Sequence, residues 1–332
     1  MNIYKSEKSG IFTVSLDFEL YWGLRDQTTI NEYEANLKGV KIAIERILEL
    51  FDKYDIHATW ATVGFLFASD IEELKVLSPE KKPSYHNTNL NPYKYISDSD
   101  DLLQYCHFAP EIINKICGHK NQEIGTHTFS HYYCLEKGQT AEEFSSDIKT
   151  VIKTSRKNDI IIKSLVFPRN QWNNEYLSIL DEYGITSYRG NEKGWLYKAT
   201  NKPDEKLIKR ALRLIDSYIN ISGSNNYFLE SINTEKPYNI PSSRFLRPVS
   251  KRLSKFENIR KKRIIKSLKQ AAKNQQVFHL WWHPHNFGAN IDDNIEFLDA
   301  ILSSFRDLKM QYGMRSLNMG EISNIISSEI EI

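Results

Sequence analysis

The chain has 332 residues, of which 40% are hydrophobic, and a formal net charge of +2 at pH 7. This composition is typical of a soluble globular protein with a full hydrophobic core, and the length alone allows two domains. The near-zero charge and the absence of a recognition motif argue against nucleic acid as a partner.

The cysteines and the N-terminus bear on localisation. The chain has three cysteines, none in a Cys-x-x-Cys pair, which favours a reducing compartment. Residues 1–10 are polar and lysine-bearing rather than a cleavable signal, and no apolar run approaches the about 18 residues of a membrane span. We therefore expect a cytoplasmic protein.

Residues 11–16 form an apolar, β-branched run that ends at Asp17 and Glu19. This pattern predicts a buried strand whose carboxyl end reaches a site. Because side chains alternate along a strand, Asp17 and Glu19 are expected on the same side, with Phe18 opposite. A solvated strand end is the alternative interpretation.

Strands and helices are predicted to alternate along the rest of the chain. Apolar residues at helical spacing over 37–51 predict the first helix. Further strands are expected near residues 57, 123, 164, 185 and 277, helices near 141, 174, 256 and 292, and a strand–helix pair after 314. Such alternation predicts an α/β fold with a parallel sheet. We expect one domain over 1–332, because candidate site residues near both ends must meet.

Two segments are predicted to be insertions. Residues 70–118 are rich in polar turn formers, which indicates a long loop over the site. Residues 190–275 contain a basic helical stretch over 251–266 with Glu257 as its only acid. This stretch could contact the diphosphate of a nucleotide- or lipid-linked sugar, or an anionic membrane face, although a solvated helix face is the simpler alternative.

A histidine pair, His127 and His131, follows the short Gly-bearing segment 123–126. The segment is more typical of a strand end entering a loop than of a helix interior. Two imidazoles and one carboxylate leave an open coordination position, which is typical of a catalytic divalent metal site. Coincidental spacing is the alternative.

Two later strands also end in candidate site residues. Residues 165–167 precede Arg169 and Asn170, and a guanidinium there could hold a carboxylate through two hydrogen bonds, or form a surface ion pair. The strand near 277–282 carries His279 and leads to His283 and His285. His283 is predicted in the pocket and His279 in the core, whereas His285 is either a substrate contact or a loop residue without a chemical role.

Taken in order, these blocks resemble the polysaccharide deacetylases with NodB homology, carbohydrate esterase family 4. The matching segments are residues 15–19, 57–64, 127–131, 167–171 and 280–283. The chain departs from the family in three respects: Glu19 stands where the family generally has Asp, Pro168 precedes the arginine, and residues 189–195 are only a candidate for the fourth motif. The first departure leaves open which of the two acids binds the metal.

The resemblance implies a distorted (β/α) barrel with its site at the carboxyl ends of the strands, and a divalent ion, with zinc favoured. By motif position, Glu19, His127 and His131 would bind the metal. Asp17 would be the general base, Arg169 would hold Asp17, and His283 would be the general acid. A backbone N–H near Asn170 would stabilise the oxyanion. Candidate substrate contacts are Trp22, Asn170, Trp172 and His285, together with Trp195 and Trp281 as further stacking residues.

The implied activity is removal of an N-acetyl or N-formyl group from a sugar precursor of a surface polysaccharide or glycolipid. The precursor could be linked to a nucleotide or lipid diphosphate, and the enzyme could lie at the inner membrane face through residues 251–266. Two alternatives remain: an amidase of the same superfamily that acts on a small cyclic amide, and a non-catalytic glycan-binding protein that retains the fold.

Overall fold

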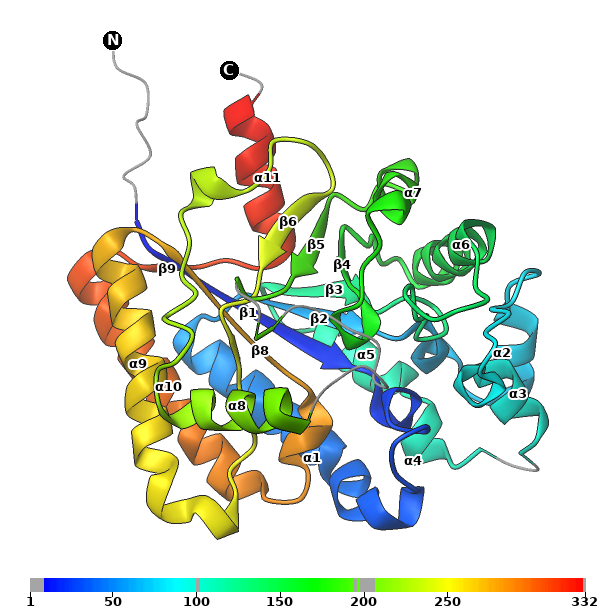
Figure 1. Ribbon diagram of the computed structural model, residues 1–332, viewed down its shortest axis with the longest axis horizontal. Helices are drawn as coiled ribbons and strands as arrows, with labels where there is room; N and C mark the ends of the chain where they lie inside the picture. Colours follow the sequence, from blue (N-terminus) through cyan, green and yellow to red (C-terminus); the bar gives the residue numbers. More distant parts are fainter. Residues whose placement is uncertain (1–8, 100–101, 194–195, 198–206, 331–332) are drawn as a thin grey trace.

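A single curled sheet of parallel strands organises the molecule. The computed structural model describes residues 9–99, 102–193, 196–197 and 207–330. Within them the sheet has nine strands, in the order β6-β5-β4-β3-β2-β1-β8-β7 with β9 paired to β1 (Figure 1). The strands are β1 Ile11–Phe18, β2 Ala58–Thr62, β3 Gln122–Thr126, β4 Ser164–Val166, β5 Ser187–Gly190, β6 Tyr238–Pro241, β7 Arg244–Phe245, β8 Val277–Trp282 and β9 Arg315–Ser316.

The two edges of the sheet are joined by the turn between β6 and β7. The N–H of Ser242 donates to the carbonyl of Gly190 on β5 at 2.9 Å, and the N–H of Ser243 donates to the carbonyl of His279 on β8 at 2.8 Å. One bent segment therefore connects opposite ends of the strand order. The result is the distorted (β/α) barrel that the sequence predicted.

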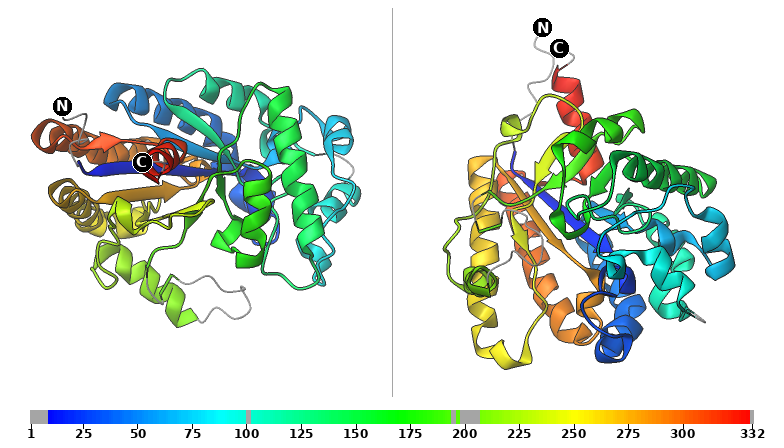
Figure 2. Two further views of the ribbon diagram at one scale, coloured as in Figure 1. Left: turned by 90° about the horizontal axis from the view of Figure 1, so that it is seen from above. Right: turned by 45° about the vertical axis from the view of Figure 1, so that its right-hand side comes forward.

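Helices cover the outside of the barrel (Figures 1 and 2). The longer ones are α1 Ile30–Tyr54, α6 Ala141–Lys157, α8 Leu207–Tyr218, α9 Ser254–Asn274, α10 Ile291–Tyr312 and α11 Met319–Ile330; α7 Leu177–Glu182 is shorter. Helix α1 begins with a capping box between Thr29 and Glu32 and buries the predicted apolar face that includes Ile44 and Phe51. Among the described residues, no helix combines the length and apolarity that a membrane span needs.

The segment 70–118, predicted as a long loop, instead contains four short helices. They are α2 Ile71–Leu77, α3 Pro92–Ser97, α4 Gln104–His107 and α5 Pro110–Cys117. The polar turn formers are helix caps, because the Asp70 and Asn91 side chains accept hydrogen bonds from the first turns of α2 and α3. Apolar residues such as Leu74 and Ile113 join the main core. The loop prediction is therefore wrong.

The segment 190–275, predicted as an insertion, contributes β6 and β7 to the barrel. These strands have four and two residues, which is too short for a clear alternating pattern. The basic stretch 251–266 forms a 3-10 turn at Lys251–Leu253 and then the first part of helix α9. Single-turn 3-10 helices lie at Leu20–Gly23, Gly64–Phe67, Thr88–Leu90, Pro168–Asn170, Asn174–Tyr176, Leu229–Ser231, Lys251–Leu253 and Pro284–Phe287.

His279 on β8 is a core residue, as its position in the strand predicted. Its Nε2 lies 2.8 Å from Ser15 Oγ and its Nδ1 lies 3.2 Å from the carbonyl oxygen of Pro241, so the ring connects three parts of the barrel. Burial, with the nearby Arg189 cation adding to it, lowers the pKa of His279 to about 3. The imidazole is therefore neutral in the folded protein.

This buried histidine predicts acid sensitivity. An unfolded chain protonates histidine near pH 6.5, whereas folded His279 resists protonation until about pH 3. Between these values the unfolded state binds more protons, so the free energy of unfolding falls as the pH is lowered. We expect urea midpoints to decrease from roughly pH 7 to pH 4 and to decrease less steeply in His279→Gln. An unchanged slope in His279→Gln would contradict the assignment.

Candidate metal centre

Three predicted ligands converge where β1 and β3 end. Glu19 follows β1 directly, His127 follows β3, and His131 lies four residues further on. Glu19 Oε2 lies 2.9 Å from His131 Nε2 and 3.3 Å from His127 Nε2. All three side chains are buried, and one ligand atom from each lies within 4.8 Å of the others. The group could hold a metal ion, so the predicted convergence of these residues is confirmed.

The contacts of the two imidazoles suit metal binding. His127 Nδ1 lies 2.8 Å from the carbonyl oxygen of Val166, which can only accept, so Nδ1 carries a proton and Nε2 is the nitrogen available to a metal ion. Burial lowers the pKa of His131 to about 4, and this ring is therefore neutral near pH 7. Burial alone would raise the pKa of Glu19, but the surrounding histidines outweigh this effect. The net pKa of Glu19 is therefore well below its ordinary value.

The residues present therefore fit a divalent ion. They offer two imidazole nitrogens and one ionised carboxylate, which is the donor set of a catalytic site with an open position. Gly23 makes room for the carboxylate, because a Cβ at this position would lie only 2.1 Å from Glu19 Cδ. The tight 3-10 turn after β1 thus allows the Glu19 side chain to reach the histidines.

The loop between the two histidines is held from outside by Asp147 on α6. Thr128 and His131 both have left-handed backbone angles, with φ of 64° and 57°. The Asp147 carboxylate accepts the N–H of Phe129 at 2.6 Å, the N–H of Ser130 at 3.0 Å and the hydroxyl of Ser130. Burial raises the pKa of Asp147 to about 6. A buried carboxylate therefore fixes the turn that presents His131.

Replacing Asp147 by asparagine is expected to weaken metal binding. The side-chain NH2 of asparagine would face one of the two backbone N–H groups that the carboxylate accepts, so one hydrogen bond becomes a donor–donor contact. We expect metal affinity to fall by about 10- to 100-fold, as for other residues that orient metal ligands. Competition with a chromophoric chelator measures the change. The Asp181→Asn control on α7 should keep wild-type affinity, and an unaltered affinity in Asp147→Asn would contradict the role.

Asp17, the predicted general base, lies next to the metal group but has a different partner from the one predicted. Two nitrogens of Arg189 on β5 donate to its two carboxylate oxygens at 2.6 and 2.8 Å. The same guanidinium donates to Ser15 Oγ at 3.0 Å and Asn170 Oδ1 at 2.9 Å, and it lies over the Trp281 ring. Burial raises the pKa of Asp17, but Arg189 together with His127 and His283 more than offsets this effect, and the net pKa is lowered. Asp17 is therefore a fixed, ionised carboxylate.

The prediction that Arg169 holds Asp17 is wrong. Arg169 pairs with Asp26 and lies 3.5 Å from Glu136, with its guanidinium 3.9 Å from the centre of the Tyr133 ring. It has a left-handed φ of 57°, so strand alternation does not govern the direction of its side chain. The sequence feature that could have identified Arg189 as the partner of Asp17 is its position inside a short strand, because an arginine buried in a strand needs a carboxylate partner. The sequence analysis considered Arg189 only as part of the candidate fourth motif, 189–195. Gly194 and Trp195 of that candidate motif lie outside the described residues.

His283 lies where the sequence predicted, after the carboxyl end of β8. Its Nε2 is 3.7 Å from Asp17 Oδ2 and 3.6 Å from Glu19 Oε1, and its side chain is 23% exposed. It is thus the most accessible of these site residues. His285 lies beside it, with ring centres 5.1 Å apart, but is buried against Tyr33. A contact of His285 with substrate stays a prediction.

The other predicted substrate contacts differ in accessibility. Trp22 is fully buried, donates its indole N–H to the carbonyl of His107 at 2.8 Å and packs on Phe65, so its predicted role in sugar stacking is wrong. Trp172 is half-buried and lies against Tyr188. Asn170 uses its backbone N–H for the carbonyl of Phe167, so this N–H is not free for an oxyanion.

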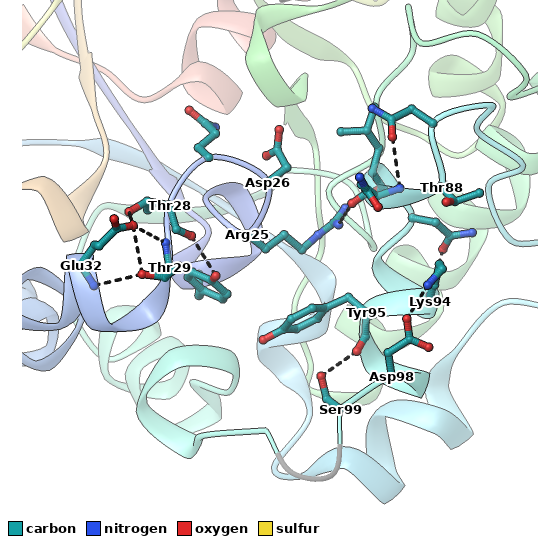
Figure 3. Close-up of a pocket in the computed structure, with 16 residues that line it drawn as sticks. Arg25, Asp26, Thr28, Thr29, Glu32, Thr88, Lys94, Tyr95, Asp98 and Ser99 are labelled. Atoms are coloured by element: carbon teal, nitrogen blue, oxygen red, sulfur yellow. Dashed lines mark hydrogen bonds and ion pairs between the residues drawn. The ribbon is translucent and has the colours of Figure 1, made fainter.

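A polar pocket of about 720 Å³ lies beside this site, between the loop after β1 and the inserted segment 87–99 (Figure 3). Arg25 crosses it from the loop to the carbonyls of Asn89 and Leu90. Its lining combines charged and amide groups with two aromatic rings: Tyr21, Arg25, Asp26, Asn89, Lys94, Tyr95 and Asp98. Asp26 connects the pocket to the metal group, because its partner Arg169 lies over Tyr133, whose hydroxyl is 3.1 Å from His131 Nδ1.

Comparisons with known proteins agree with this arrangement. Residues 38–188 match the family described as polysaccharide deacetylase. A candidate polysaccharide deacetylase from Mycobacterium smegmatis has the same fold, with a TM-score of 0.61, 11% identity, and coverage of 99% of this chain and 94% of that one. A second structure, described as a probable polysaccharide deacetylase from Pseudomonas aeruginosa PAO1, also has this fold. Its TM-score is 0.53 at 10% identity, with coverage of 98% of this chain and 93% of that one.

PuuE allantoinase also shares the fold, with a TM-score of 0.52, 10% identity, and coverage of 96% of this chain and 91% of that one. A search of curated protein sequences finds no significant match. At these identities the solved structures establish the fold alone, whereas the matched segment 38–188 includes the histidine pair. Over residues 38–188 the chain therefore matches the polysaccharide deacetylase family, and its fold is that of the two solved structures described as polysaccharide deacetylases.

Proposed function

We propose that this protein is a metal-dependent hydrolase that removes an N-acetyl or N-formyl group from a sugar used in surface polysaccharide or glycolipid synthesis. One observation carries the proposal: a buried two-histidine, one-carboxylate group lies within 4 Å of a partly exposed histidine that also faces a fixed aspartate. Amide hydrolysis needs such a set, namely a Lewis acid site, a proton acceptor and a proton donor.

The chain's own residues take distinct roles in the reaction. Glu19, His127 and His131 would hold the divalent ion, with zinc favoured, and the ion when bound would supply Lewis acidity toward the acyl carbonyl and the attacking water. Asp17, oriented by Arg189, accepts the proton of the water as it attacks the carbonyl carbon. His283 then donates a proton to the departing sugar amine.

The substrate class is proposed from the surroundings of the site. The neighbouring polar pocket offers hydrogen-bonding groups for hydroxyls and the rings of Tyr21 and Tyr95 for a sugar face. A sugar carried on a nucleotide or lipid diphosphate is the proposed form. The three cysteines are unpaired, which supports a location in the reducing cytoplasm, where such precursors are made.

The test combines metal analysis with deacylation assays. Purified protein would be analysed for bound zinc, manganese, iron and cobalt, and release of amine would be followed on N-acetyl and N-formyl amino sugars, free and diphosphate-linked. We expect Asp17→Asn to keep the metal but lose about 10²- to 10⁴-fold in kcat, the usual contribution of a proton-transfer group. Protein without a bound divalent metal and without metal-dependent deacylation would overturn the proposal and favour a glycan-binding role. Hydrolysis of a small cyclic amide instead would favour the alternative amidase.

A further inference from the structure

Helix α8 has its apolar side facing solvent. Ile208, Leu214, Ile215 and the following Ile219 are exposed, the first and last to 71% and 64% of their surface, whereas Asp216 and Ser217 are buried. A helix packed on a globular core normally shows the opposite arrangement. Exposed apolar stripes of this kind mark surfaces that contact another molecule or a membrane.

The reversed orientation is fixed by Asp216. Its carboxylate accepts from Arg244 of β7 at 3.2 Å and from Arg263 of α9 at 3.0 Å, and also from the hydroxyl of Tyr197. The N–H groups of Ile221 and Ser222 donate to it at 2.9 and 2.7 Å. These interactions hold the polar side of α8 against the barrel, so its apolar side cannot turn inward without unpairing buried charges.

The first turns of α9 extend this surface. Phe256 and Ile259 are about half exposed, at 51% and 49%, and the Phe256 ring lies 6.5 Å from that of Tyr218 on α8. Exposed basic residues surround the apolar ones: Lys251, Arg252, Lys255 and Lys262. Figure 1 shows α8 lying directly beside α9. We call the exposed parts of 208–221 and 251–262 the α8/α9 face.

The exposed charge of this face is entirely basic in its described residues. The acids in these two segments are Asp216 and Glu257, and both are buried and paired with arginines, Glu257 with Arg260. The whole chain carries a formal net charge of only +2, so positive charge is concentrated here. A protein partner with a mixed surface would not require this combination, whereas isoleucine and phenylalanine surrounded by lysine and arginine match the interface of an anionic bilayer.

We propose that the α8/α9 face binds the surface of anionic membranes. The aliphatic side chains and Phe256 enter the boundary between headgroups and acyl chains, and the surrounding lysine and arginine side chains contact lipid phosphates. This binding is separate from the hydrolytic site and does not depend on the reaction proposed for it.

Co-sedimentation with vesicles tests the proposal on the whole 332-residue chain. One set contains phosphatidylcholine alone and the other phosphatidylcholine mixed with phosphatidylglycerol. We expect binding to the anionic vesicles only, with the partition coefficient lowered roughly tenfold or more by Lys255→Ala with Lys262→Ala, and weakened by high salt. Ile215→Glu with Ile219→Glu is expected to remove binding, because carboxylates on the apolar side oppose insertion and repel anionic lipid.

Matched controls come from other faces of the molecule. Val76→Glu with Ile161→Glu changes apolar residues that are more exposed than Ile215 and Ile219, and Lys153→Ala with Lys157→Ala removes exposed charges on α6. Both pairs should bind as wild type does, and circular dichroism melts would show that every variant folds. Binding to neither vesicle, or equal loss in the controls, would overturn the proposal. So would a dimer in light scattering that Ile215→Glu with Ile219→Glu dissociates, because the face would then contact a second copy.

Discussion

Replacing His127 by alanine is expected to release the divalent ion and to abolish most hydrolytic activity. The change leaves one imidazole and one carboxylate, and the buried Glu19 loses a neighbour 3.3 Å away. A catalytic zinc site normally needs three protein ligands. Because a Lewis acid supplies several kcal/mol of transition-state stabilisation and each about 1.4 kcal/mol is a factor of ten, kcat should fall on the order of a thousandfold.

Metal content by mass spectrometry and kcat on the best substrate measure this prediction together. His119→Ala is the matched control, because His119 pairs with Asp52 and lies outside the ligand group. It should keep both the ion and the activity. If His127→Ala retained a full equivalent of metal with normal turnover, the ion would have to bind elsewhere. A further variant, Glu19→Ala, separates the two acids, since it should lose the metal that Asp17→Asn keeps.

The barrel was predictable because its strands and helices have clear periodicity. The apolar run of β1 and the helical spacing over 37–51 require only local patterns, and both elements form as predicted. The three metal-group residues could be predicted for a related reason. They lie just beyond the carboxyl ends of parallel strands, and such ends meet at one edge of the barrel.

What could not be predicted depends on contacts between distant segments. The helices of 70–118 are short, so in the sequence their capping residues resemble turn formers. Only the packing of their apolar residues against the core distinguishes these helices from a loop. Trp22 had the composition expected near a sugar site, but whether a tryptophan is buried or exposed depends on neighbours such as Phe65 and His107. β6 and β7 form because the sheet edges on either side offer hydrogen bonds, which their own sequence does not indicate.

The partner of Asp17 is the most consequential of these long-range contacts, and it can be tested directly. Arg189→Lys is expected to lower the free energy of unfolding by about 3 kcal/mol, because an ammonium cannot reproduce the paired donation to Asp17 while also reaching Ser15 and Asn170. It should also lower kcat by about 10- to 100-fold, since the orientation of the proton acceptor is lost. Urea unfolding and steady-state kinetics measure the two effects.

Arg169→Lys makes the comparison decisive, because both arginines are largely buried and paired with acids, yet only Arg189 contacts Asp17. Arg169 lies with Asp26 and Glu136 at the side of the site, so its replacement should affect kcat less than Arg189→Lys. The readout specific to orientation is the coupling with Asp17. In the Asp17→Asn background, where the negative charge is gone, Arg189→Lys should cause little further loss of kcat, whereas Arg169→Lys should have the same effect as in wild type. Full additivity of Asp17→Asn and Arg189→Lys would show that the two residues act independently, and the guanidinium of Arg189 would then be structural only.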